Sequence, residues 1–179
     1  MGATEDFFAL FHRSAFRVEA LPQYLGTSTP AFRAFEASGR LTPLDERPAK
    51  QNWMHHVFAA TAAGVHVARV HVLDLPLSSY LRYELAAYPE NIEAGEDVFI
   101  AVRSAHRSLG DLTTDFWLLD DKEPSASVLL MHYDDEGRFT AQTHTDEPEV
   151  LRRCRAQRDL ALAHAVPYDQ FIATSNTNT

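Results

Sequence analysis

Cysteine is almost absent from this sequence, which has only Cys154 among its 179 residues. One thiol excludes an intramolecular disulfide and a Cys-x-x-Cys metal or redox site, which favours a reducing compartment. Long hydrophobic runs are also missing, and none approaches the roughly 18 to 20 residues of a membrane helix. The first residues carry acids where a signal peptide is basic. We therefore expect a soluble, cytoplasmic protein that does not enter a membrane.

Basic residues are in deficit, and glycines are few and scattered. Lys and Arg number 16 against 25 Asp and Glu, a formal net charge of −9, so the surface should repel polyanions. The glycines occur singly, which excludes a phosphate-cradling loop, and there is no Gly-x-Ser-x-Gly nucleophile elbow. We expect no direct nucleic-acid binding and no cofactor.

Hydrophobic periodicity predicts one α/β domain over residues 1–172, because the chain is long enough for a sizeable core and 45% of it is hydrophobic. Alternating or β-branched runs predict strands at 16–20, 67–73, 98–102, 116–119, 128–133 and 138–144. Helical spacing predicts helices at 1–13, 29–39, 51–63, 78–87 and 148–167. The expected fold is a single-domain sandwich with a mixed β-sheet flanked by helices, followed by a disordered polar tail at 173–179.

The first predicted strand has a two-sided pattern. Phe16 and Val18 alternate with Arg17 and Glu19, which indicates a half-buried strand with one solvent-facing side. By contrast, the β-branched run VHVARVHVLDL, residues 65–75, predicts a central strand.

The segment TTDFWLLDDK, residues 113–122, reads as a buried strand between acids. Asp115, Asp120 and Asp121 could form a general acid and base pair. Adjacent strand residues point to opposite faces, however, so at most one of Asp120 and Asp121 shares a face with a given partner. We expect Asp115 and Asp120 to tie strand ends, through backbone N–H groups or an arginine such as Arg103 or Arg107.

A polar helix face follows the central strand in the segment YLRYELAAYPEN. Tyr80, Glu84 and Tyr88 recur at spacings of four, with Arg82 and Asn91 near by. The helix begins just beyond the carboxyl end of a strand, where open α/β sheets bind ligands. The pattern favours a pocket for a small polar ligand or a peptide, and the alternative is an ordinary amphipathic helix.

A second group of candidate ligands lies in MHYDDEGRF, residues 131–139. Alternation places His132 and Asp134 on one face, which could begin a metal site or contribute to a ligand pocket. No third ligand follows at a recognisable spacing, and DDEG is also a typical hairpin turn. We therefore expect no metal centre.

The segments SAFRVEALPQY, TAAGVHVARVHV, YLRYELAAYPENIEAGED, DFWLLDD, MHYDDEGRF and RDLALAHAVP together resemble an actinobacterial family known only as a domain of unknown function. The resemblance covers nearly the whole chain. It implies a gene neighbourhood with helix-turn-helix regulators and assigns no reaction.

The layout of residues 52–135 also resembles the phospholipase D superfamily, through AAGVHVARVHV, AAYPENIEAGEDVFIA and DFWLLDDKEPSASVLLMHY. Aligning Asp120 with the aspartate of the His-x-Lys-x-x-x-x-Asp signature places Thr113 at the histidine and Asp115 at the lysine. The resemblance therefore implies a phospholipase D-like fold that has lost its nucleophile and its phosphate-binding cation. It also implies pairing into a homodimer.

These observations favour a non-catalytic regulatory or interaction module whose partner is a protein, such as a helix-turn-helix regulator. A basic stripe on the last long helix fits an acidic partner, although it could equally be a solvated helix face. The stripe consists of Arg152, Arg153, Arg155 and Arg158. The alternative is a small-molecule enzyme or ligand-binding protein that uses the Tyr, Arg, Glu and His side chains described above.

Overall fold

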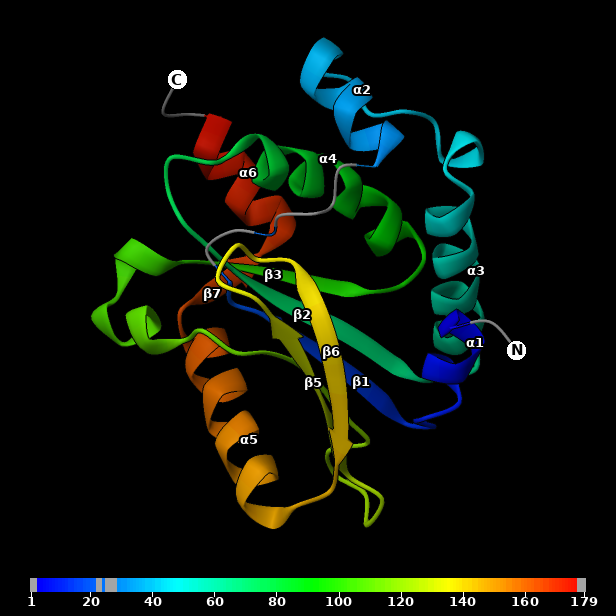
Figure 1. The fold of residues 1–179 in the computed structure, drawn as a ribbon, viewed down its shortest axis with the longest axis vertical. Helices are drawn as coiled ribbons and strands as arrows, with labels where there is room; N and C mark the ends of the chain where they lie inside the picture. Colours follow the sequence, from blue (N-terminus) through cyan, green and yellow to red (C-terminus); the bar gives the residue numbers. More distant parts are fainter. Residues whose placement is uncertain (1–2, 22–23, 25–28, 177–179) are drawn as a thin grey trace.

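A seven-stranded mixed sheet forms the centre of the protein in the computed structural model, which describes residues 3–21, 24 and 29–176 (Figure 1). The strands are β1 Ser14–Glu19, β2 His66–Leu73, β3 Asp97–Val102, β4 Asp115–Leu119, β5 Ser127–Tyr133, β6 Phe139–Thr145 and β7 Ala165–Pro167. The helices are α1 Ala3–Phe8, α2 Pro30–Ser38, α3 Pro48–Ala62, α4 Ser79–Glu93, α5 Pro148–Ala163 and α6 Tyr168–Asn176. Short 3₁₀ helices occur at Leu44–Glu46, Arg103–Ala105 and Arg107–Asp111.

The strand order across the sheet is β6-β5-β4-β1-β2-β3-β7. β1, β2 and β3 are parallel neighbours, whereas β4, β5 and β6 form an antiparallel meander and β7 pairs antiparallel with β3. Helices α3, α4 and α6 lie on one side of the sheet and α5 on the other (Figure 1). The predicted mixed α/β fold is confirmed. Among the described residues, no helix combines the length and the apolar character needed to cross a membrane.

The two faces of the sheet differ in chemistry. Toward α5, side chains such as Phe16, Val18 and Val70 form a continuous apolar core. On the opposite face, the centre of the sheet carries the buried side chains of Arg17 and Arg69. The prediction that Arg17 and Glu19 face solvent is therefore wrong, because ion pairs with the neighbouring strands β4 and β2 compensate the loss of solvent contact.

The carboxyl-terminal region also departs from the sequence interpretation, which predicts one helix to Pro167 and a disordered tail from residue 173. α5 ends at Ala163, and Ala165, Val166 and Pro167 pair with β3 instead. Proline is tolerated there because an edge strand need not donate every N–H group. The chain then forms α6 through Asn176, and the Thr174 hydroxyl donates to the Gln170 and Phe171 carbonyls. The rest of the predicted tail lies outside the described residues.

Candidate functional site

A layer of buried polar side chains lies between the sheet and helices α3 and α4, and we call it the polar layer. Its members from the sheet and the adjoining loops are Arg17, Glu19, Tyr24, Arg69, His71, Glu96 and Asp115. Its members from the helices are Lys50, Tyr80, Glu84, Tyr88 and Asn91. β1 and β2 are in register, with Arg17 beside Arg69 and Glu19 beside His71. Alternation therefore brings all four side chains to one face.

The arginines of the polar layer are paired with carboxylates. Arg17 Nη2 donates to Asp115 Oδ2 at 2.9 Å, and Arg69 donates to Glu96 Oε1 at 2.6 Å and to Glu19 Oε2 at 3.0 Å. Burial opposes ionisation of Glu19, but Arg69, His71 and Arg17 outweigh it and lower its pKa to about 2. Because these cations and anions neutralise one another, the layer tolerates burial without a counter-ion from outside.

Asp115 and Asp120 have structural roles. Asp120 accepts N–H groups from His12, Arg13 and Ser14, which confirms the expected tie to the backbone. Asp115 accepts the N–H groups of Ala20 and Leu21 and the Tyr24 hydroxyl, at 2.7 Å.

The arginine partner of Asp115 is Arg17, which the sequence interpretation missed. The arginines that it named were Arg103 and Arg107, and Arg103 donates instead to the carbonyls of Ala20, Leu109 and Leu112.

Four of the residues predicted on the polar helix face do meet in the structure. Ser78 caps the helix by accepting the N–H of Leu81, and this places Tyr80, Glu84, Tyr88 and Asn91 toward the sheet. Asn91 Nδ2 donates to Glu96 Oε2 at 2.6 Å, and Lys50 Nζ donates to Asn91 Oδ1 at 2.6 Å. Burial raises the pKa of Glu84 and lowers that of Lys50. Arg82 points away and donates to the Leu77 carbonyl.

His71 is held in one orientation by a chain of hydrogen bonds. The Tyr88 hydroxyl lies 3.3 Å from Glu19 Oε2 and 2.5 Å from His71 Nδ1. If Tyr88 donates to the Glu19 carboxylate, its oxygen accepts Nδ1–H of His71, which leaves Nε2 as an acceptor. Burial lowers the pKa of His71 to about 4, so the imidazole is neutral at pH 7.

Two buried polar atoms of the layer have no hydrogen-bond partner among the described residues. They are Arg17 Nη1 and His71 Nε2. Both side chains approach the same carboxylate, because Glu19 lies 3.6 Å from Arg17 Nε and 3.8 Å from His71 Nδ1. Buried groups of this kind normally find a partner in protein, water or ligand.

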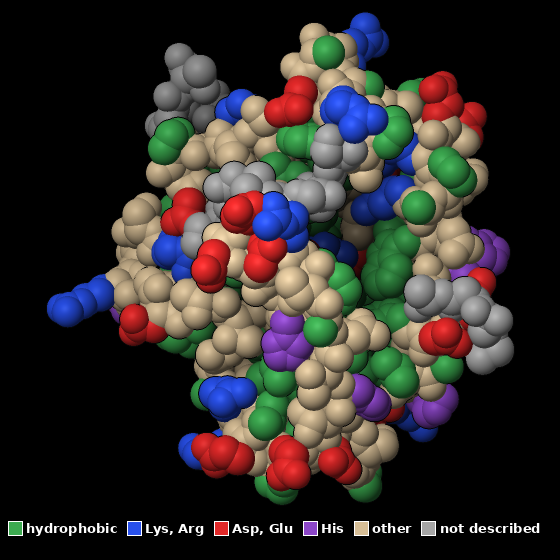
Figure 2. All heavy atoms as spheres, in the orientation of Figure 1, with side chains coloured by type: hydrophobic (Ala, Val, Ile, Leu, Met, Phe, Trp, Pro, Cys, Tyr) green, Lys and Arg blue, Asp and Glu red, His purple; other side chains and the backbone are tan. Residues whose placement is uncertain are grey.

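Tyrosine rings gather beside these atoms. The ring of Tyr24 lies 6.1 Å from that of His71, 5.7 Å from Tyr80 and 5.6 Å from Tyr133. The Tyr133 hydroxyl accepts from Arg17 Nη2 at 3.3 Å. Figure 2 shows a hollow in the surface between the β5–β6 hairpin and α3, with hydrophobic and basic side chains recessed in it. The arrangement joins aromatic surface to hydrogen-bonding groups, as in small-molecule sites.

The other candidates from the sequence lie elsewhere. His132 is exposed and contacts Thr143 Oγ1 at 2.9 Å, whereas Asp134 accepts N–H groups within its own turn. In the basic stripe, Arg155 and Arg158 both contact Asp121. Arg152 pairs with Glu149, and Arg153 is exposed. The structure therefore places neither group at the polar layer.

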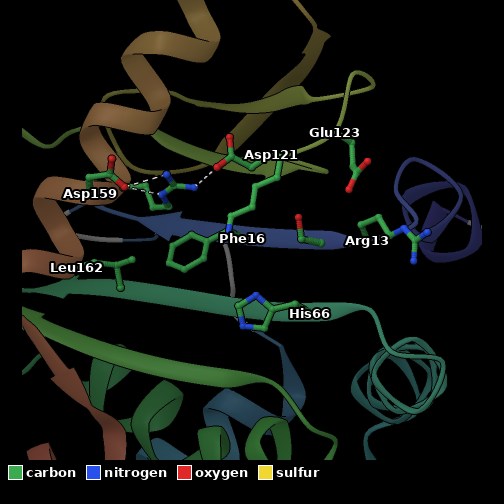
Figure 3. Close-up of a pocket in the computed structure, with 10 residues that line it drawn as sticks. Arg13, Phe16, His66, Asp121, Glu123, Asp159 and Leu162 are labelled. Carbon is green, nitrogen blue, oxygen red and sulfur yellow. Dashed lines mark hydrogen bonds and ion pairs between the residues drawn. The ribbon is translucent and has the colours of Figure 1, made fainter.

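A cavity of about 470 Å³ lies on the opposite face of the sheet, at the amino ends of β1 and β2. Figure 3 shows Asp121 and Asp159 bonded to one arginine of its lining, which is Arg158. His66 pairs with Asp97 at 2.9 Å. The polar layer is the stronger candidate, because among the described residues it holds buried polar atoms without a hydrogen-bond partner, whereas the lining of this cavity holds none.

A family described as a domain of unknown function, DUF6879, matches residues 2–173. The chain belongs to this family. Among the curated proteins, none matches the chain. The family description names no reaction or ligand.

The polar layer contains four sheet residues that the sequence interpretation did not select, namely Arg17, Glu19, Arg69 and His71. One signal was available for β2. Arg69 and His71 interrupt a run of valines that predicts a central strand, and a central strand covered on both faces must bury its charged side chains. The partners of the buried charged residues could not be inferred from the sequence. For example, Arg17 and its partner Asp115 lie 98 positions apart.

Proposed function

We propose that the polar layer binds a small, uncharged molecule rich in hydroxyl groups, and that the protein is a non-catalytic regulatory or interaction module that responds to it. The observation that carries the proposal is the pair of buried atoms, Arg17 Nη1 and His71 Nε2, for which the described part of the chain offers no hydrogen-bond partner. Leaving such groups unsatisfied costs about 1 to 3 kcal/mol each, so a ligand that satisfies them gains affinity.

The chemistry of the two atoms selects the ligand class. Arg17 can only donate, whereas His71 Nε2 accepts in the tautomer that Tyr88 favours. A hydroxyl group can serve either atom, because it both accepts and donates. The charged groups around them are already paired with one another, which disfavours a charged ligand. The tyrosine rings suit the apolar face of a sugar or a cyclic polyol.

The same contacts support binding over catalysis. A histidine with a pKa of about 4 is a weak base at neutral pH, and general bases work best when their pKa lies near the working pH. Glu19 and Asp115 accept from arginines, so neither carboxylate is poised to take a proton from a substrate. The binding signal would pass to a partner protein, and a helix-turn-helix regulator remains our proposal on the sequence resemblance alone.

Calorimetric titration tests the ligand class. We expect D-glucose, D-ribose, myo-inositol or uridine to bind and to raise the melting temperature, and the charged relatives glucuronate and glucosamine to bind at least about tenfold more weakly. His71→Phe should abolish this binding and leave the protein folded. His66→Phe is the matched control, because His66 is exposed at the far end of β2. Equal binding by the His71 variant, or no binding by any uncharged member, would contradict the proposal.

A further inference from the structure

Strand β6 forms one edge of the sheet and is exposed along its length. Among the described residues it pairs with β5 alone, and residues 139–144 are exposed on both faces. Its sequence, FTAQTHT, contains no Lys, Arg, Asp, Glu, Pro or Gly. Proteins normally use such charges, prolines and bulges to prevent an open edge from pairing with another strand. The pairing of β6 with β5 is irregular at residues 139–141, where a bulge lies opposite His132 and Tyr133, and is regular at residues 141–145. The regular part of β6 therefore has the features of an edge that can pair with another strand.

The surface over this edge carries little charge along its middle. Figure 2 looks onto the β5–β6 hairpin, and the atoms over β6 form a mainly tan band with charged side chains gathered beyond its ends. In the sequence, Arg138 immediately precedes β6, and Asp146 and Glu147 immediately follow it. The strand itself is thus uncharged, with Arg138 directly before it and two acids directly after it.

We propose that β6 pairs antiparallel with β6 of a second copy of this chain, about a two-fold axis at Gln142, so that the two sheets become continuous. In this register, Gln142 faces its own counterpart and Ala141 faces Thr143 of the partner subunit. Thr140 faces His144 of the partner subunit. Each opposed pair is uncharged when histidine is neutral, and paired glutamine amides can hydrogen-bond across the axis.

The charges at the strand ends favour this register. Antiparallel pairing places Arg138 opposite Asp146 of the partner subunit, and the symmetry repeats this contact at the other end. Parallel pairing would instead place each arginine against its own counterpart. The Arg138 side chain is 54% exposed and contacts Asp134 and Glu136 of the turn. In this register Arg138 is the residue that faces Asp146 of the partner subunit, whereas the acids of the turn precede the paired residues.

Cysteine cross-linking tests the position of the axis. Gln142→Cys places two thiols opposite each other, where Cα atoms lie about 4.5 to 5.5 Å apart, within reach of a disulfide. Thr140→Cys is the matched control, because its counterpart lies four positions along the strand, roughly 13 Å away. The native Cys154 is fully buried and should not contribute. We expect the Gln142 variant to form covalent dimer about tenfold faster than the Thr140 variant under mild oxidation.

Charge reversal tests the register independently by sedimentation. Asp146→Arg sets two arginines against each other at both ends and should weaken the dimer about tenfold, whereas Asp146→Arg with Arg138→Asp should restore it. A denaturation curve for each variant confirms that it is folded. The proposal is overturned if the parent sediments only as a 20.1 kDa monomer at every concentration. The proposal is also overturned if Asp146→Arg leaves the dimer affinity unchanged, or if the two cysteine variants form covalent dimer at equal rates.

Discussion

Asp115 and Asp120 lie at the two ends of β4, and each is surrounded by a different set of donors. Burial would raise the pKa of Asp120, but the N–H groups of Ser14, Arg13 and His12 outweigh it and lower that pKa. Burial raises the pKa of Asp115, although Arg17 opposes the shift. The pKa of each carboxylate is therefore set by its donors, which come from segments distant in the sequence. Neither is left free to exchange protons with a substrate.

The role of Asp120 can be tested at the level of one residue. Its backbone has a φ of 47°, a left-handed conformation that Asn tolerates and Ala does not. Asp120→Asn keeps one oxygen acceptor, so we expect it to lower the free energy of unfolding by about 1 kcal/mol. Asp120→Ala loses the acceptors and adds backbone strain, so it should cost about 3 kcal/mol.

Urea denaturation of both Asp120 variants measures these costs. Asp135→Asn is the control, because Asp135 is exposed in the β5–β6 turn and should change stability by less than about 0.5 kcal/mol. If Asp120→Ala costs no more than the Asp135→Asn control, the backbone tie contributes nothing to stability.

At the scale of elements, Trp117 joins β4 to helices α1 and α3. Its ring lies 4.8 Å from Phe7 and 5.9 Å from Trp53, and the Arg17 guanidinium stands 5.7 Å above it. Truncating this buried ring removes contacts with both helices. We expect Trp117→Ala to lower the free energy of unfolding by about 3 to 5 kcal/mol.

The measurement for Trp117 is again urea denaturation, with Phe58→Ala as the control for loss of an aromatic ring. Phe58 is 60% exposed, so its truncation should cost less than about 1 kcal/mol. If the two variants lose similar stability, the packing of α1 and α3 on β4 does not depend on Trp117.

The elements differ in how far their sequences determine them. β2 and β5 have β-branched or alternating runs, and the β5–β6 turn has Gly137 at φ 73°, so pattern alone predicts them. β7 has three residues and no pattern of its own, and it forms only because β3 offers an edge. Likewise, the spacing of Tyr80, Glu84 and Tyr88 predicts a polar helix face. The arginines beneath that face depend on strand order, which local patterns do not encode.

At the scale of the whole molecule, the sheet separates an apolar layer under α5 from a polar layer under α3 and α4. The apolar layer buries hydrophobic side chains and so stabilises the fold. The polar layer links strands and helices through hydrogen bonds and ion pairs of specific geometry. For example, Arg69 donates hydrogen bonds both to Glu19 of β1 and to Glu96, and Glu96 accepts a hydrogen bond from Asn91 of α4. Each such bond forms in only one arrangement of the elements, so the layer favours a single packing.

Burying a neutral histidine in this layer makes the stability of the whole protein depend on pH. The pKa of His71 is about 4 in the folded protein, against 6.5 for an ordinary histidine. Above pH 6.5 both states are unprotonated, and this residue adds no pH dependence. As the pH falls from 6.5 to 4, the unfolded chain binds a proton that the folded protein excludes, so stability is lost. At about 1.4 kcal/mol per pKa unit, the loss is on the order of 3 kcal/mol.

Other groups of the polar layer change the stability at lower pH than His71 does, or change it in the opposite direction. Glu19, with a pKa of about 2, loses its contribution below the ordinary glutamate range. Glu84 and Asp115 have raised pKa values, so the folded protein takes up their protons first, and they offset part of the loss. The effect of His71 must therefore be read as a difference between the parent and a variant that cannot titrate at this position.

His71→Gln provides that difference, because glutamine still hydrogen-bonds to Tyr88 but stays neutral. We expect the parent to lose stability relative to this variant as the pH falls from 6.5 to 4, with the curves parallel above 6.5. Urea midpoints at half-unit pH intervals give both curves. His66→Gln is the matched control for replacing a histidine on the same strand, because the His66 side chain is 62% exposed. If the parent and His71→Gln curves stay parallel throughout, His71 has the same pKa in the folded and the unfolded protein, and the exclusion of its proton from the polar layer would be wrong.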